Sequence, residues 1–127
     1  MGYKDTLIII NKILDELIEK NKKIPIVVEG EKDIKALLKL DIKGKILTLN
    51  KGVSLTNFCD NIANKYKEII ILTDWDKKGG YLCHTMKKNL QGRVKCDTYF
   101  REVLAKNSIT KKVEGLPSWI NSLYEKV

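Results

Sequence analysis

The sequence predicts an α/β fold of the Rossmann-like, three-layer type, with a mainly parallel four-stranded sheet and helices on both of its faces. Three short apolar runs carry this prediction, within residues 24–29, 45–49 and 69–72. They are rich in β-branched side chains, and the first and third are continuous rather than alternating, which is typical of parallel strands buried on both faces. Segments with helical periodicity separate the runs, so the predicted element order is α-βα-βα-βα-β-αα.

The first helix is predicted over residues 5–21, with Asp5 as its N-cap. Its apolar side chains recur at helical spacing on one face and are Leu7, Ile10, Leu14 and Leu17. Pro25 prevents continuation of the helix but is tolerated at the start of a strand, which we place at residues 24–29. The second helix begins at Glu31, because acidic side chains suit the positive end of the helix dipole.

The second strand is predicted at residues 45–49, and the chain then turns at residues 50–52. A third helix follows, capped by Ser54 or Thr56. Its apolar face is formed by Leu55, Phe58, Cys59, Ile62, Ala63 and Tyr66. The third strand lies at residues 69–72.

Residues 77–80, with the sequence KKGG, are predicted to turn the chain into a fourth helix. The apolar face of this helix is formed by Leu82, Cys83, Met86 and Leu90. Gly92 breaks the helix, and residues 93–97 alternate polar with apolar side chains, which indicates a strand near the sheet edge. A short helix over residues 99–105 and a last helix with Pro117 at its first position complete the chain.

The length of 127 residues and the apolar content of 43% are sufficient for one domain with its own core. We expect a single domain over residues 1–127, with its core at about residues 24–100. The N-terminal helix (5–21) and C-terminal helices (99–126) are expected to pack on that core. Because the sequence has no run of about 18 apolar residues and no signal-peptide pattern, we expect a cytoplasmic protein without a membrane partner.

The formal net charge of +8 is distributed unevenly along the chain. Residues 1–76 carry 13 basic and 12 acidic side chains, whereas residues 77–127 carry 11 basic and only 4 acidic ones. A basic half of this kind indicates an anionic partner, nucleic acid above others. The alternative is that the lysines only promote solubility.

Three carboxylates are predicted at the ends of two strands. Glu29 closes the first strand, and Asp74 and Asp76 follow the third. Parallel strands end on the same side of a sheet, so the three side chains converge if these strands are neighbours. Clustered carboxylates repel one another unless they share a proton or a hard cation, and oxygen-only ligands suit Mg²⁺.

Lysines and glycines accompany the predicted acidic site. Lys77 and Lys78 directly follow the aspartates and are candidates for binding the phosphates of a nucleic acid. Lys32, at the start of the second helix, and Lys51, in the turn after the second strand, are further candidates for nucleic-acid binding. We interpret three glycines as loop residues that leave room for a ligand to approach, namely Gly30, Gly52 and Gly79.

The motif VVEGEKD at residues 27–33, together with LTDWDKKG at residues 72–79, resembles the Toprim domain. This domain is shared by primases, topoisomerases and ribosomal-RNA maturation nucleases. The resemblance covers about residues 24–100 and is greatest to small stand-alone Toprim proteins of prokaryotes.

The resemblance implies a Mg²⁺ site of one or two ions, at which Mn²⁺ can substitute. It implies that Glu29 acts as a general acid or base or binds the metal, and that Asp74 and Asp76 coordinate Mg²⁺, with Asp74 able to bridge two ions. The glycines of the two motifs correspond to Gly30 and Gly79. The chain departs from the family at Gly80, where many relatives carry an acidic residue, and this puts binding of a second ion in doubt.

The leading functional hypothesis is Mg²⁺-dependent phosphodiester hydrolysis or transfer on RNA or DNA, with nuclease-like chemistry. The alternative is a non-catalytic, nucleic-acid-binding accessory module whose metal site is structural or regulatory. Both hypotheses are compatible with a protein partner or with a homodimer. A phosphoryl-accepting domain is a third class, but such a domain would place its acidic pair after the first strand, where only Glu29 is found.

Overall fold

A computed structural model describes residues 2–49 and 52–127 of the chain. Its centre is a four-stranded sheet in which every pair of neighbouring strands is parallel, as expected from the continuous apolar runs. The strand order is β2-β1-β3-β4. These strands are β1 (Ile26–Val28), β2 (Ile46–Thr48), β3 (Glu68–Ile71) and β4 (Lys95–Asp97). The alternating half-exposed pattern near residue 95 is explained, because β4 lies at an edge of the sheet.

β1 lies directly beside β3, which is the arrangement required for convergence of the predicted carboxylates. Val27 of β1 is in register with Leu47 of β2 on one side and with Ile71 of β3 on the other. From β1 the chain proceeds outward to β2, and it then returns to β3 and proceeds outward in the opposite direction to β4. The reversal of strand order therefore lies between β1 and β3, where ligands bind in open parallel sheets.

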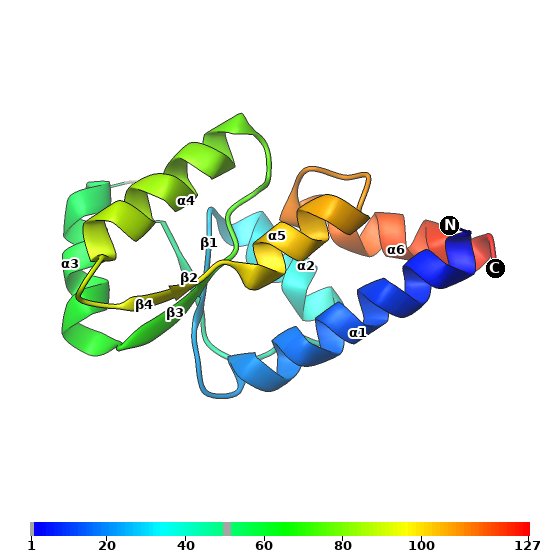
Figure 1. The fold of residues 1–127 in the computed structure, drawn as a ribbon, viewed down its shortest axis with the longest axis horizontal. Helices are drawn as coiled ribbons and strands as arrows, with labels where there is room; N and C mark the ends of the chain where they lie inside the picture. The colour runs from blue at the N-terminus through cyan, green and yellow to red at the C-terminus, as the bar shows by residue number, and fades with distance from the viewer. Residues whose placement is uncertain (1, 50–51) are drawn as a thin grey trace.

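Two layers of helices cover the sheet (Figure 1). Side chains alternate along the central strands, so that Ile26 and Ile70 face one core and Val27 and Ile71 face the other. One layer holds α1 (Tyr3–Asn21), α2 (Glu31–Lys39), α5 (Tyr99–Asn107) and α6 (Leu116–Glu125). The other holds α3 (Leu55–Lys65) and α4 (Lys77–Leu90). Each fully buried aliphatic side chain contributes about 1.5–3 kcal/mol, so both faces stabilise the sheet.

Three of the predicted helix starts are shifted in the structure. Asp5 lies inside α1, where its carboxylate accepts a hydrogen bond from the backbone N–H of Gly2, the N-cap residue. The α4 helix begins at Lys77, so the segment predicted as a turn at residues 77–80 is helical. The α6 helix begins at Leu116, so Pro117 is its second residue. Ser54 is the residue that caps α3, since its hydroxyl accepts from the N–H of Asn57.

The chain after β4 returns to the face of the sheet that α1 and α2 cover. A 3₁₀ turn, η1 (Val113–Gly115), follows α5 and contacts α2. The α6 helix packs against α1, and Figure 1 shows the two ends of the chain side by side. The ammonium of Lys126 lies 4.8 Å from the centre of the Tyr3 ring. Among the described residues, no helix is both long and apolar enough to cross a membrane.

Candidate metal centre

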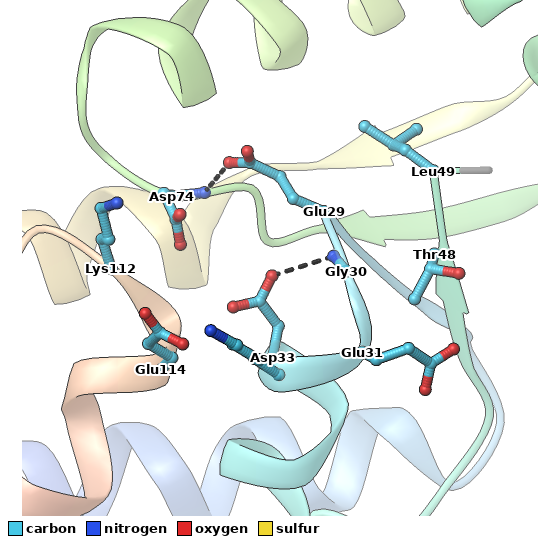
Figure 2. A pocket seen from close by; sticks show the side chains of 10 residues that line it. Glu29, Gly30, Glu31, Asp33, Thr48, Leu49, Asp74, Lys112 and Glu114 are labelled. Atoms are coloured by element: carbon cyan, nitrogen blue, oxygen red, sulfur yellow. Dashed lines mark hydrogen bonds between the residues drawn. The ribbon is translucent and has the colours of Figure 1, made fainter. Parts of the chain in front are cut away.

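Glu29 and Asp74 meet at the carboxyl ends of the two central strands. Glu29 follows β1, and its Oε2 accepts a hydrogen bond of 2.8 Å from the backbone N–H of Asp74, which follows β3 (Figure 2). The bond exists because β1 and β3 are adjacent and parallel, so that both chains leave the sheet at the same place. The structure thus brings together two of the three carboxylates that the sequence predicts.

Asp74 is the most buried of the three predicted carboxylates, with 8% of its surface exposed. Its Oδ1 accepts a hydrogen bond of 2.8 Å from the N–H of Val113. Burial raises the pKa of Asp74 above its ordinary value, and the negative charges of Glu29 and Asp76 raise it further. The Val113 hydrogen bond and the charge of Lys112 act in the opposite direction. A bound cation would remove the repulsion that disfavours the ionised form.

Asp76 has a local role at the start of α4. It is the N-cap of this helix, and its Oδ1 accepts a hydrogen bond of 2.8 Å from the N–H of Gly79. Asp76 influences Asp74 electrostatically, but it does not line the cavity that Glu29 and Asp74 share. Each of the three carboxylates therefore binds one backbone N–H and retains an oxygen with no hydrogen-bond partner in the described part of the chain.

A cavity of about 680 Å³ opens beside Glu29 and Asp74. Figure 2 shows that it is predominantly acidic, because Asp33 and Glu114 face Asp74 across it. The full lining consists of Glu29, Gly30, Glu31, Lys32, Asp33, Thr48, Leu49, Asp74, Lys112 and Glu114. Carboxylate oxygens suit a hard cation rather than an apolar ligand.

Asp33, Glu114 and Lys112 line the cavity but are not among the site residues predicted from the sequence. Asp33 lies in the first turn of α2, where its Oδ2 accepts a hydrogen bond of 3.1 Å from the N–H of Gly30. Asp33 is 7% exposed and lines the cavity. Its place in the same sequence motif as Glu29 is the signal that could have identified it as a site residue. Glu114 and Lys112 had no local signal, because only the return of the chain after α5 places them there.

The loop that carries the aspartates is fixed by segments distant in sequence. The N–H of Trp75 donates to the carbonyl of Lys111, and its indole Nε1 donates to the carbonyl of Thr110 at 2.6 Å. The guanidinium of Arg101 donates to the carbonyls of Thr73 and Asp74, at 3.1 and 2.8 Å. The indole of Trp75 packs against the core and so supports the loop. These bonds hold the carboxylates in position before any ligand arrives.

The predicted lysines occupy different places around the site. Lys32 lines the acidic cavity, and Lys78 lines a neighbouring cavity of about 270 Å³ that Glu29 also borders. Lys77 is exposed at the first position of α4. The prediction for Lys51 concerns a residue outside the described parts of the chain.

The three predicted loop glycines differ in what surrounds them. Gly30 is the N-cap of α2 and Gly52 lies in a turn, and a Cβ at either position would meet no atom within 4 Å. The interpretation of Gly79 as a loop glycine is wrong, because it lies in the first turn of α4. A Cβ at Gly79 would lie 1.8 Å from the carbonyl oxygen of Asp74, so the missing side chain makes room for the protein's own backbone rather than for a ligand.

The donor set is compatible with Mg²⁺. Among residues 2–49 and 52–127, no three acidic, histidine or cysteine side chains converge into a preformed metal cage. Mg²⁺ does not require such a cage, since it keeps several waters and binds through one or two carboxylates and a substrate phosphate. Glu29 and Asp74 both line the cavity, and among the described residues each carboxylate keeps one oxygen without a hydrogen-bond partner.

Comparison with known proteins identifies related chains of similar length. A family profile described as the Toprim domain matches residues 24–106. A UPF0292 protein of Thermoplasma volcanium is 43% identical over 108 residues, which cover 84% of this chain and 91% of the relative. A UPF0292 protein of Methanosarcina acetivorans is 35% identical, with 98% of this chain and 88% of the relative covered.

A solved structure of a protein from Aquifex aeolicus has the same fold. It superposes with a TM-score of 0.71 at 28% sequence identity, over 82% of this chain and 94% of the other. Toprim domains generally bind Mg²⁺ and act on nucleic acids. From the profile match, the similar relatives and the position of Glu29 and Asp74 at the ends of β1 and β3, we conclude that this chain belongs to the Toprim family.

Proposed function

We propose that this protein binds Mg²⁺ through Glu29, Asp74 and Asp76 and uses it for phosphodiester hydrolysis or transfer on RNA or DNA. The observation that carries the proposal is the direct hydrogen bond from the backbone of Asp74 to Glu29 at the reversal point of the sheet. This bond joins the two motifs into one site. Glu29 Oε1 and Asp74 Oδ2 have no hydrogen-bond partner in the described part of the chain, so they suit the binding of a hydrated cation.

The proposed roles follow from the burial of each side chain. Asp74 is buried, and its Oδ1 accepts a hydrogen bond from the N–H of Val113. Its carboxylate is therefore held in a fixed position and is suited to bind the metal directly. Glu29 is only half-buried, so its second oxygen can bind the metal or exchange a proton with a nucleophile or leaving group. Asp76 retains one oxygen beyond its capping bond and supplies further negative charge. When bound, Mg²⁺ would supply electrostatic stabilisation of the negative charge that develops on the phosphate.

The cations near the site suit the phosphates that flank the reacting one. Lys78 borders the smaller cavity next to Glu29, and Lys32 lines the acidic cavity. Lys77 is exposed at the first position of α4, directly before Lys78. Exposed lysines contribute to nucleic-acid binding mainly by releasing counterions, which does not depend on base sequence. The proposal therefore concerns the backbone of RNA or DNA and no particular sequence.

One observation limits the number of metal ions at the site, and the second candidate function is a binding module without turnover. The position at which many Toprim relatives carry an additional acid is Gly80, and a Cβ at Gly80 would lie 3.6 Å from the guanidinium of Arg101. A cation next to this position disfavours a second metal ion there. One-ion binding is therefore the form of the site that this chain supports best.

Titration with Mg²⁺, followed by calorimetry, tests the metal assignment. We expect Asp74→Asn to weaken Mg²⁺ binding by about tenfold or more, which corresponds to at least about 1.4 kcal/mol. Asp15→Asn is the matched control, because it removes the same charge from an exposed position on α1. Equal affinities of the wild type and Asp74→Asn would exclude Asp74 as a ligand.

Turnover is tested with end-labelled single- and double-stranded RNA and DNA in the presence of Mg²⁺. We expect cleavage or strand transfer by the wild type and its loss in Glu29→Gln, since glutamine can still accept the hydrogen bond from Asp74. Activity that survives Glu29→Gln would remove Glu29 from the chemistry. Mg²⁺ binding with no turnover of the four substrates would favour the accessory module.

A further inference from the structure

Lys112, like Lys32, is a cation that lines a cavity with five carboxylates. It lies between α5 and η1, beyond the residues that match the Toprim profile. Its side chain lines the cavity together with Glu29 and Asp74, and Figure 2 shows it next to Asp74 and above Glu114. The side chain is exposed, and within the described residues its ammonium forms no ion pair.

The backbone on both sides of Lys112 is bound to the loop that carries the aspartates. The carbonyl of Lys111 accepts a hydrogen bond of 3.0 Å from the N–H of Trp75. The N–H of Val113 donates to Asp74 Oδ1 at 2.8 Å. The carbonyl of Lys112 itself accepts from the N–H of Gly115 at 3.1 Å. Because three bonds fix this short segment, the Lys112 side chain starts from a defined point beside Asp74.

We propose that Lys112 binds a phosphate of the nucleic-acid substrate at the metal centre. This inference rests on the proposed function, and it adds to the site a cation from outside the Toprim core. Five carboxylates line the cavity and repel a polyanion, so an incoming phosphate requires positive charge on the same wall. A lysine ammonium binds phosphate as a point charge with three donors, and Lys112 has no carboxylate at ion-pair distance that would occupy those donors.

The position of Lys112 beside Asp74 also predicts an effect on Mg²⁺ affinity that is opposite to its effect on nucleic-acid affinity. A fixed positive charge beside Asp74 repels Mg²⁺, so its removal should strengthen binding of the ion. A lysine that binds phosphate therefore changes the two affinities in opposite directions. A lysine that only contributes to solubility changes neither, and one that only supports the loop weakens both.

The test compares Lys112→Met with Lys111→Met, a neighbouring exposed lysine whose side chain does not line the cavity. Binding of a fluorescein-labelled, mixed-sequence oligonucleotide is measured in EDTA over a series of salt concentrations. We expect Lys112→Met to weaken binding several-fold and to reduce the salt slope by about one, the value for one lost phosphate contact. Lys111→Met should retain the wild-type slope, and Lys112→Arg should restore it.

The second measurement is a Mg²⁺ titration of the same variants without oligonucleotide. We expect Lys112→Met to bind Mg²⁺ more tightly than the wild type and Lys111→Met to be unchanged. Equal effects of the two methionine variants on both ligands would overturn the role of Lys112 while leaving the proposed function intact. If the wild type binds Mg²⁺ but no oligonucleotide, the proposed function fails, and the role of Lys112 in substrate binding fails with it.

Discussion

At the scale of single residues, Asp33 shows that one carboxylate can serve both the fold and the site. Its Oδ2 accepts the N–H of Gly30 at the start of α2, which is a local capping interaction. Burial raises the pKa of Asp33 above its ordinary value of 3.8, and the charge of Asp74 and then that of Glu114 raise it further. The ionised form is therefore disfavoured in the folded protein, and its presence at neutral pH is a cost that a bound cation would offset.

This cost leads to a prediction for Asp33→Asn. Because the pKa is raised in the folded state, the stabilising contribution of the wild-type carboxyl is fully present below about pH 3.8 and is lost as the pH rises through the folded-state pKa. Asparagine is neutral and can still accept the Gly30 hydrogen bond. We expect Asp33→Asn to be more stable than the wild type at pH 7 in EDTA, with the difference shrinking toward pH 4.

Urea unfolding at a series of pH values checks this expectation. Glu31→Gln is the control, because Glu31 lines the same cavity but is exposed and has no capping bond among the described residues. A stability difference for Asp33→Asn that does not change with pH would contradict the electrostatic explanation. Addition of Mg²⁺ should reduce the advantage of the variant at pH 7, since the ion stabilises only a state that binds it.

At the scale of elements, the start of α4 determines the position of the aspartate loop. Asp76 caps the helix, and the buried hydroxyl of Thr73 donates to the carbonyl of Gly79 at 2.8 Å. The first turn of α4 thus lies directly against the backbone of Asp74. Only a residue without a Cβ fits at Gly79, because the Cβ would lie 1.8 Å from Asp74 O and 2.5 Å from its carbonyl carbon.

The two adjacent glycines of α4 should therefore respond in opposite ways to the same change. We expect Gly79→Ala to destabilise the protein by about 1–3 kcal/mol or more, the usual range for overpacking, because the atoms in the way are backbone. We expect Gly80→Ala to stabilise it by up to about 1 kcal/mol through helix propensity, since a Cβ there makes an ordinary 3.6 Å contact with Arg101.

Thermal unfolding of both variants, together with Mg²⁺ titration, measures these effects. Gly79→Ala should also weaken Mg²⁺ binding, because any relief of the clash moves Asp74. Gly80→Ala should leave Mg²⁺ binding unchanged. Similar stabilities for the two variants would show that the first turn of α4 does not constrain the aspartate loop.

At the scale of the whole molecule, positive charge is concentrated in the part of the sequence that follows the aspartates. The +7 charge balance of residues 77–127, from 11 basic and 4 acidic side chains, begins at the helix that follows Asp76. Lys77 and Lys78 lie at the end of α4 near the metal centre, whereas Lys87 and Lys88 lie in its last turn. Both pairs are exposed, carry the same charge and lie on one helix. A comparison of variants of the two pairs therefore distinguishes an effect of position from an effect of net charge.

We expect the double variant Lys77→Ala/Lys78→Ala to bind oligonucleotide more weakly than Lys87→Ala/Lys88→Ala, although both reduce the net charge equally. The physical reason is that only the first pair lies beside the proposed path of the phosphates. Fluorescence anisotropy over a salt series measures the difference, and each lost phosphate contact should reduce the salt slope by about one. Equal losses for both pairs would indicate binding by net charge alone.

The fold was largely predictable because its signals are local. Continuous apolar runs identified β1 and β3, and their burial on both faces follows from the two cores. Helical periodicity identified each α-helix, and the differences lie at the ends of strands and helices. The start of α4 is the clearest example. There the sequence KKGG suggested a turn, whereas the Asp76 cap and the space left by Gly79 allow the helix to begin at Lys77.

The sequence by itself determined the element order, the parallel sheet and the placement of Glu29, Asp74 and Asp76 at strand ends, because these depend on periodicity and chain direction. Only the tertiary structure decided that β1 lies beside β3, and that Glu29 accepts the N–H of Asp74. It also decided that the segment carrying Lys112 and Glu114 returns to the same cavity. Such contacts join residues far apart in the chain, and they follow from how the helices pack rather than from any local pattern.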